Sequence, residues 1–165
     1  MMFKVNGFRV EELNNKDLNE IVEVYNSNKN FLISHMDKKE ITIEWMIEEL
    51  KSMKEIGFLC CKIVDMNSEK IVGVIDFKVD KETYLSLLMI HNNYKNKGLG
   101  RLIYKGLEKY ALSLKSNCIR IDVVADYDDS VIEFWTKNRF VKFKDTILNW
   151  TGKDLDAIVM KRNLT

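Results

Sequence analysis

The sequence predicts one mixed α/β (α+β) domain: a single, mostly antiparallel sheet of about six to seven strands with helices on both faces. Apolar residues recur at helical spacing in some segments and alternate at strand spacing in others. The segments follow in the order strand, two helices, three strands, helix, strand, helix, two strands, which places helices on the faces of a mixed sheet. The 165 residues contain no proline and no linker rich in glycine and serine, so residues 1–165 are expected to form one domain.

The first part of the chain should contain a short strand and two amphipathic helices. Phe8–Leu13 has strand character. Apolar residues within Leu18–Tyr25 lie at positions i, i+3, i+4 and i+7, which predicts a helix beginning near Asp17. The same spacing recurs within Ile43–Leu50, where Thr42 is a suitable N-cap.

The period then changes to that of strands. Phe58–Asp65 and Lys70–Lys78 are predicted to form an antiparallel hairpin, and Tyr84–Ile90 a third strand. Leu99–Leu114 keeps one apolar face and predicts the longest helix, and the connection from Tyr84–Ile90 through it to the next strand should be a right-handed parallel crossover. The remaining expected elements are a strand at Cys118–Val124, a short helix at Val131–Trp135, and strands at Lys142–Ile147 and Leu155–Arg162.

Composition excludes several functions. Lys and Arg number 26 against 25 Asp and Glu, so no overall basic charge favours nucleic acid. The longest aliphatic run, Leu87–Ile90, is too short to cross a membrane, and the start of the chain lacks the apolar core of a signal peptide. Cys60, Cys61 and Cys118 form neither a CxxC motif nor a Cys/His cluster, so we expect free thiols, no metal site and a cytoplasmic location.

A glycine-rich, basic segment before the longest helix carries the clearest chemical signal. Two glycines two residues apart let the backbone approach a ligand closely. The helix start presents unpaired N–H groups and a partial positive charge, which together with lysine and arginine side chains favours a diphosphate. A solvated basic helix start is the alternative. The residues assigned to this anion site are Lys95, Asn96, Lys97, Gly98, Leu99, Gly100 and Arg101.

Three phosphate-binding patterns compete for this segment. A Walker loop needs Gly-Lys-Ser/Thr, but Arg101 follows Gly100. A dinucleotide fingerprint needs a third glycine where Ile103 stands. The pattern [Gln/Arg]-x-x-Gly-x-[Gly/Ala] matches Lys95–Gly100 in all but its first residue.

With this motif the sequence resembles the GNAT superfamily of N-acetyltransferases, which bind acetyl-coenzyme A there. Downstream, Val124–Phe140 looks like the family's second signature, Asn-x-x-Ala-x-x-[Phe/Leu]-Tyr-x-Lys-x-Gly-Phe. Upstream, Lys70–Ile75 resembles its third strand. The similarity spans about Phe8 to Lys161, nearly the whole chain.

The resemblance implies a sheet that splays at its central parallel pair, between the strand ending at Ile90 and Cys118–Val124. Pantetheine would pair with the backbone of Leu88 and Ile90, and the Ile90 N–H would polarise the thioester carbonyl. The amine would attack the acetyl group directly, without an acyl-enzyme on Cys118. By the same resemblance, further cofactor-binding residues are Met89, Asp128 and Trp135. Lys137, and with it Lys105, could reach the 3′-phosphate or adenine end of the cofactor; the alternative is that both are solvated surface lysines.

Five positions depart from the family pattern. Trp135 replaces the tyrosine credited with protonating the departing thiolate, and an indole N–H cannot do this. Tyr127 could take that role, or the thiolate could leave unassisted. The other departures are Lys95 for Gln or Arg, Asp128 for Asn, Arg139 for Gly and Asn92 for the frequent Pro.

Asp76 is our candidate for the base that deprotonates the amine, because it interrupts an apolar strand and could face the slot. His35, in a stretch expected to be mobile, and His91 are alternatives, since histidine titrates near neutrality. Asp122 and Asp126, which flank the second slot strand, are two more candidates. Glu44 and Glu48 are interpreted as the solvated face of the second helix. Trp45 and Trp150 are interpreted as core residues, with lining of an acceptor pocket as the alternative.

Two functions therefore remain open. The first is acetyl-CoA-dependent acetylation of a primary amine on a small molecule or peptide. The second is a non-catalytic CoA-binding sensor or regulatory module, which Trp135 favours because it removes the family's acid. A homodimer through the final strand pair, near Gly152, is a possible assembly.

Overall fold

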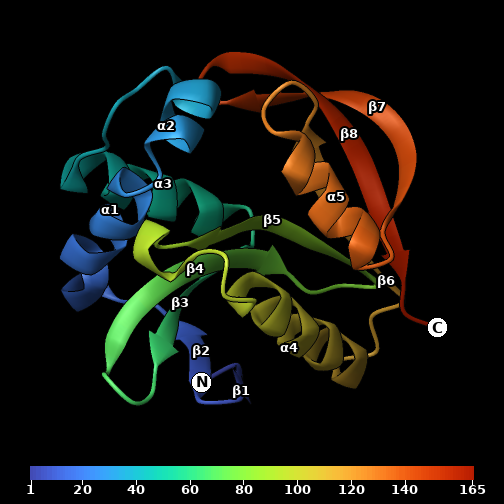
Figure 1. Cartoon of the computed structure of the whole chain (residues 1–165), viewed down its shortest axis with the longest axis horizontal. Coiled ribbons are helices and arrows are strands. Elements are labelled where there is room, and N and C mark those ends of the chain that lie inside the picture. The colour runs from blue at the N-terminus through green and yellow to red at the C-terminus, as the bar shows by residue number, and fades with distance from the viewer.

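The computed structural model describes all residues, 1–165, and contains one eight-stranded sheet (Figure 1). Its strand order is β1-β2-β3-β4-β5-β6-β8-β7, and every neighbouring pair is antiparallel except β5 and β6. The strands are β1 (Phe3–Val5), β2 (Phe8–Glu12), β3 (Leu59–Asp65), β4 (Lys70–Lys78), β5 (Glu82–Ile90), β6 (Cys118–Val124), β7 (Val141–Trp150) and β8 (Lys153–Asn163). The predicted mixed, mostly antiparallel sheet is confirmed.

Helices cover both faces of this sheet, as the sequence predicted. The first three helices pack on one face, around a core that includes Ile21, Leu32 and Met46. The last two pack on the other, around Ile103, Leu107 and Trp135 (Figure 1). The helices are α1 (Leu18–Asn26), α2 (Lys29–Met36), α3 (Ile43–Glu55), α4 (Leu99–Ser113) and α5 (Asp129–Lys137). None of them combines the length and apolar character that crossing a membrane requires.

Two elements differ from the sequence-based expectation. The eighth strand, β1, adds one to the expected six to seven; its three residues are too few to show a period. Side-chain atoms of Phe3 and Val5 each lie 2.6 Å from the position that a Cβ would occupy at Gly106, so the lack of a side chain there makes room for β1. The stretch expected to be mobile, which contains His35, is instead helix α2. It buries Leu32, His35 and Met36 on one face, and the polar histidine hides this pattern in the sequence.

The sheet opens between β5 and β6, which confirms the splay that the family resemblance implied. Parallel pairing joins Glu82–Tyr84 to Cys118–Arg120 and then stops. A register shift against β4 makes Ser86 an extra residue in β5 at this point, because Phe77 pairs with Leu85 and Asp76 with Leu87. Such a bulge bends its strand. Beyond the bulge, β5 stays paired with β4, and β6 stays paired with β8. The edges of β5 and β6 that face each other are therefore unpaired there.

Candidate active site

A cavity of about 220 Å³ occupies the opening between β5 and β6. Its lining is mainly apolar and comes from β5, β6, α2, α5 and the loops beside them. Figure 1 shows α2 and α5 on either side of this opening. A mainly apolar cavity with a few polar groups, placed at the split of a sheet, is typical of a binding site for a small molecule.

The backbone of Leu88 and Ile90 faces this opening. The His91 N–H donates to Val72 O on β4 at 2.8 Å. Because neighbouring residues of a strand point their N–H and C=O groups to opposite sides, the polar groups of Leu88 and Ile90 face away from β4. No strand pairs with them there, since β6 has diverged. The backbone of Met89, in contrast, faces β4, and only its side chain reaches the cavity.

Asn28, which no sequence motif marks, also contributes to this edge. Its Nδ2 donates to Ile90 O at 3.1 Å and to Val24 O at 2.9 Å, and the residue is 4% exposed. It therefore supplies a partner for a strand carbonyl that the splay leaves open. One asparagine between two helices has no distinctive sequence pattern, so only the structure could reveal it.

The start of α4 has the features of an anion site. No side chain caps this end of the helix, so the N–H groups of its first turn, at Leu99, Gly100 and Arg101, are available to a ligand. Gly98 adopts φ = 78°, which favours glycine, and no atom lies within 4 Å of the position a Cβ would occupy. A Cβ at Gly100 would meet only the Phe134 ring, at 3.7 Å. These residues therefore fit a bound diphosphate.

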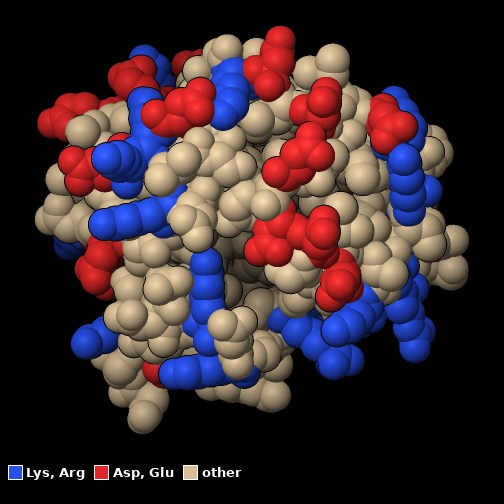
Figure 2. Space-filling view, turned by 45° about the horizontal axis from the view of Figure 1, so that its top comes forward, with Lys and Arg blue, Asp and Glu red and all other residues tan.

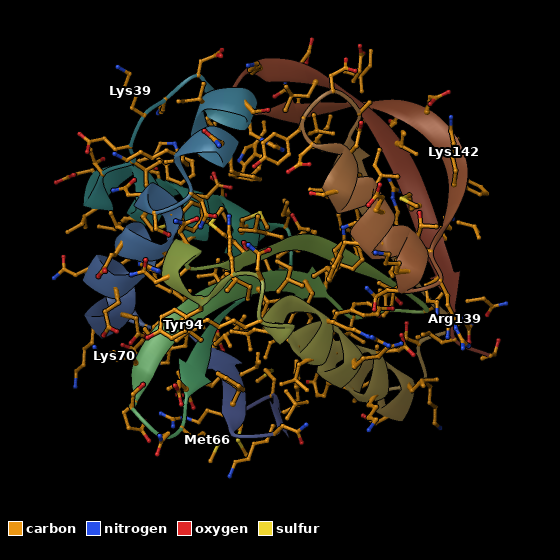
Figure 3. The ribbon with its side chains drawn as sticks, viewed as in Figure 1. Lys39, Met66, Lys70, Tyr94, Arg139 and Lys142 are labelled. Carbon is orange, nitrogen blue, oxygen red and sulfur yellow. The ribbon has the colours of Figure 1, made fainter.

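Basic side chains surround this helix start. Lys95 lines the cavity; partial burial lowers its pKa, and the nearby Asp128 opposes this effect. Asn96, Lys97 and Arg101 are exposed, with the Lys97 ammonium 5.9 Å from the ring of Tyr94. Figure 3 labels Tyr94 beside the segment that leads into α4. In Figure 2, basic side chains lie below a central hollow and acidic ones to its right.

The second signature forms the other wall. Asp128 caps α5 by accepting the Ser130 N–H at 2.9 Å, the same capping that an asparagine provides. Trp135 is 8% exposed; its ring packs edge-on against Tyr104 and Phe140 and also borders the cavity. Lys137 is exposed and lines neither this cavity nor the second one described below.

Tyr127 places a hydroxyl-bearing ring on the cavity wall. Its ring meets His35 and Phe31 edge-on, with centroids 4.9 and 6.1 Å apart. Burial, and secondarily the charge of Asp128, raise the pKa of Tyr127 above 10. The hydroxyl therefore carries its proton at neutral pH and can donate it.

A second cavity, of about 400 Å³, adjoins the first. Asp76 lies in its wall, 6% exposed, between its strand partners Cys60 and Leu87. Burial raises the pKa of Asp76 to about 7; the Cys60 thiol opposes the shift by donating a hydrogen bond, and the charge of Glu49 adds to it. The residues that line both cavities are Phe31, His35, Ser86, Leu87, Asp122 and Val124.

The alternative bases are placed less favourably. His35 lines both cavities, but its Nδ1 lies 3.0 Å from Phe31 O and burial lowers its pKa. Asp122 already accepts the Tyr84 hydroxyl at 2.6 Å and pairs with Arg120. His91 accepts the Asn93 N–H through Nδ1, and its Nε2 lies 3.5 Å from Glu23 Oε1. Residues that line neither cavity are His91, Asp126 and Cys118.

Comparison with known proteins identifies the class. The model of the acetyltransferase (GNAT) family matches residues 18–140, three quarters of the chain, so the protein belongs to this family. Among curated proteins, none matches the chain.

Solved structures share the fold at low sequence identity. A GNAT-family acetyltransferase from Bacillus anthracis is 12% identical, with TM-score 0.78 and 98% of each chain covered. A spermidine N-acetyltransferase from Vibrio cholerae, in complex with CoA and spermine, is 14% identical, with TM-score 0.73 and 96% of each chain covered. The yncA protein of Salmonella typhimurium, solved with acetyl-CoA, is 15% identical, with TM-score 0.65; the match covers 97% of this chain and 95% of that one.

Proposed function

We propose that this chain is an acetyl-CoA-dependent N-acetyltransferase that moves the acetyl group directly to a primary amine. One observation carries the proposal: two adjoining cavities meet at the open edge of β5, one bordered by Lys95 at the approach to α4 and the other by Asp76. Family membership and solved relatives that contain acetyl-CoA or CoA support it.

The cofactor end of the site would use groups that the fold leaves free. Acetyl-CoA, when bound, supplies an acetyl thioester. The N–H groups at the start of α4 and the side chains of Lys97 and Arg101 would hold its diphosphate. Leu88 and Ile90 would form strand-like hydrogen bonds with its pantetheine amides.

The reaction requires proton transfers to and from the reacting groups and the stabilisation of one developing negative charge. Asp76 accepts a proton from the incoming ammonium, so that the neutral nitrogen attacks the acetyl carbon. The Ile90 N–H stabilises the negative charge that develops on the carbonyl oxygen. The new C–N bond forms as the C–S bond breaks, and the Tyr127 hydroxyl provides a proton to the departing sulfur. The acylated nitrogen gives up its second proton, which restores the Tyr127 hydroxyl and leaves the neutral amide. Cys118 lines neither cavity, in keeping with direct transfer.

A non-catalytic CoA-binding module is the second candidate. The burial of Trp135 among Tyr104 and Phe140 favours it, since this side chain provides no acid where the family has a tyrosine. The two candidates differ in one measurable property, the release of free thiol when acetyl-CoA and an amine are supplied together.

The decisive experiment combines cofactor binding with turnover. A hundredfold excess of acetyl-CoA over its dissociation constant should add about 2.7 kcal/mol, which raises the melting temperature by about 5–10 °C for this chain length. Gly100→Val should remove that shift while the protein stays folded, because only Phe134 lies near the new side chain. Leu112→Val, an exposed position near the other end of α4, is the matched control.

Four results are informative. A shift with thiol release in an amine panel supports the enzyme, and a shift without any release supports the binding module. No shift at millimolar acetyl-CoA, or an unchanged shift in folded Gly100→Val, would overturn the cofactor site.

A further inference from the structure

We propose that the acceptor carries a single primary amine on an uncharged, apolar body of aromatic size, and that Glu49 and Asp76 hold the ammonium between them. This inference rests on the proposed function, because it assigns the second cavity to the acceptor. It excludes polyamines as preferred substrates.

The two carboxylates come from different elements. Asp76 projects from β4 and Glu49 from α3, and both line the 400 Å³ cavity. No nitrogen or hydroxyl donates to Asp76, and no salt bridge neutralises either carboxylate within the whole chain. Burial raises the pKa of Glu49, an effect that the Trp150 indole opposes by donating to it. A cation placed between the two groups would relieve their mutual repulsion.

Asp122 does not add a third free charge. The Arg120 guanidinium contacts both of its oxygens, at 3.0 and 3.1 Å, and the Tyr84 hydroxyl donates to it at 2.6 Å. The cavity thus offers one cation site, formed by Glu49 and Asp76. No lysine or arginine lines it, so nothing there favours an anionic substituent on the acceptor.

The rest of the wall suits an uncharged body. A second ammonium among these side chains would lose hydration without gaining a partner. The volume lies within the range of small-molecule sites, and flat aromatic rings on several sides favour stacking or cation–π contacts with the acceptor. The apolar residues of this wall are Phe31, Met53, Ile56, Phe58, Leu87, Val124, Leu148 and Trp150.

The roles of the two acids differ. Asp76 on β4 pairs with Leu87 of the open strand β5 and is almost fully buried, so it is the group that accepts the proton. Glu49, which faces the same cavity from α3, orients the amine. Loss of Glu49 should therefore raise the KM for the amine and leave the KM for acetyl-CoA unchanged.

The test uses 2-phenylethylamine, ethanolamine and spermidine as acceptors at saturating acetyl-CoA, with thiol release as readout. We expect kcat/KM for 2-phenylethylamine to exceed both others at least tenfold. Glu49→Gln should raise its KM at least tenfold. Glu48→Gln, the neighbouring exposed glutamate on the same helix, should behave as the wild type. A binding readout accompanies turnover: 2-phenylethylamine should further raise the melting temperature of the CoA-bound protein, but not that of CoA-bound Glu49→Gln.

A preference for spermidine or ethanolamine would overturn the substrate class while leaving acetyl transfer intact. An unchanged KM in Glu49→Gln would overturn the assignment of Glu49. Absence of both turnover and a 2-phenylethylamine shift, with the acetyl-CoA shift present, would also overturn the inference. Absence of the acetyl-CoA shift itself would instead show failure of the proposed function.

Discussion

The Asn28 side-chain amide donates a 3.1 Å hydrogen bond to the Ile90 carbonyl oxygen, across 62 positions of the sequence. The bond joins the turn between α1 and α2 to the end of β5. It satisfies a strand carbonyl whose neighbouring strand has diverged, and leaves the N–H of the same residue facing the cavity. The N-terminal helices thereby fix the edge at which we place the thioester.

Replacing Asn28 by Leu, which has a similar shape, should disturb this edge. The Ile90 carbonyl would be buried without its partner, at a cost of about 1–3 kcal/mol in the free energy of unfolding. The Ile90 N–H would also shift, so kcat/KM should fall at least tenfold. Urea unfolding and amine acetylation measure the two effects. Asn30→Leu, an exposed position on α2, is the control, and equal rates in both variants would contradict the role of Asn28.

The rate of acetylation should depend on pH through Asp76. Its pKa is raised to about 7, and only the ionised carboxylate can accept a proton. We expect kcat/KM, after correction for the ionisation of the amine itself, to fall about tenfold per pH unit below about 7. Asp76→Asn should lose most activity and this dependence together, with acetyl-CoA affinity unchanged. Retention of the acid limb in that variant would assign it to another group.

The same carboxylate should make stability depend on pH in the opposite sense from an ordinary salt-bridged acid. Folding raises the pKa of Asp76 from 3.8 to about 7, so its favourable contribution is complete below pH 3.8 and is lost as the pH rises through about 7. Between pH 5 and 8, the wild type should lose about 2–3 kcal/mol of unfolding free energy more than Asp76→Asn. Glu49, Cys60 and Tyr25, which interact with Asp76, are present in both proteins. Parallel stability curves from urea unfolding would contradict the burial of this charge.

Tyr127→Phe tests the proposed acid. The hydroxyl keeps its proton at neutral pH because burial raises the pKa of Tyr127. A thiolate leaves fairly readily without help, so we expect only about a tenfold decrease in kcat. Acetyl-CoA affinity, measured by thermal shift, should not change. Tyr110→Phe, whose hydroxyl contacts Met2 far from the cavities, controls for general loss of a hydroxyl. A full rate in Tyr127→Phe would show that the thiolate leaves unassisted.

Arg139→Gly should stabilise the protein without changing its activity. Arg139 has φ = 68°, beyond the end of α5, where its N–H donates to Thr136 O and the Phe140 N–H donates to Trp135 O. This is the Schellman arrangement, which favours glycine. Figure 3 shows Arg139 at the far end of α5.

Removing the left-handed strain of Arg139 should add about 1 kcal/mol, or about 2–4 °C in melting temperature. Arg139→Ala, which keeps the strain, should show no such gain. An equal gain in both variants would point to charge rather than backbone conformation.

The repeating patterns of the chain determined most of its elements. The change from helical to strand period located seven of the eight strands and four of the five helices, and most of them bury an apolar face. Strand β7 instead leaves Val141, Phe143 and Ile147 exposed. The glycine pair at the start of α4, Gly98 and Gly100, predicted an open helix start, since lack of a Cβ is a local property. The family pattern has a glycine at position 139, and the left-handed turn that favours this glycine is also a local feature. The chain keeps the left-handed turn although Arg139 stands at this position.

Tertiary packing decided the rest. Strand β1 has three residues, and α2 buries a histidine, so neither element shows a clear period. The helical period predicted a solvated face for Glu44 and Glu48, and both are exposed. The same period does not distinguish Glu49, the next residue, which lines the second cavity because of the way α3 packs. An acid on a helix has the same local pattern whether it faces water or a pocket; the direction is set by contacts with distant strands, which no local period records.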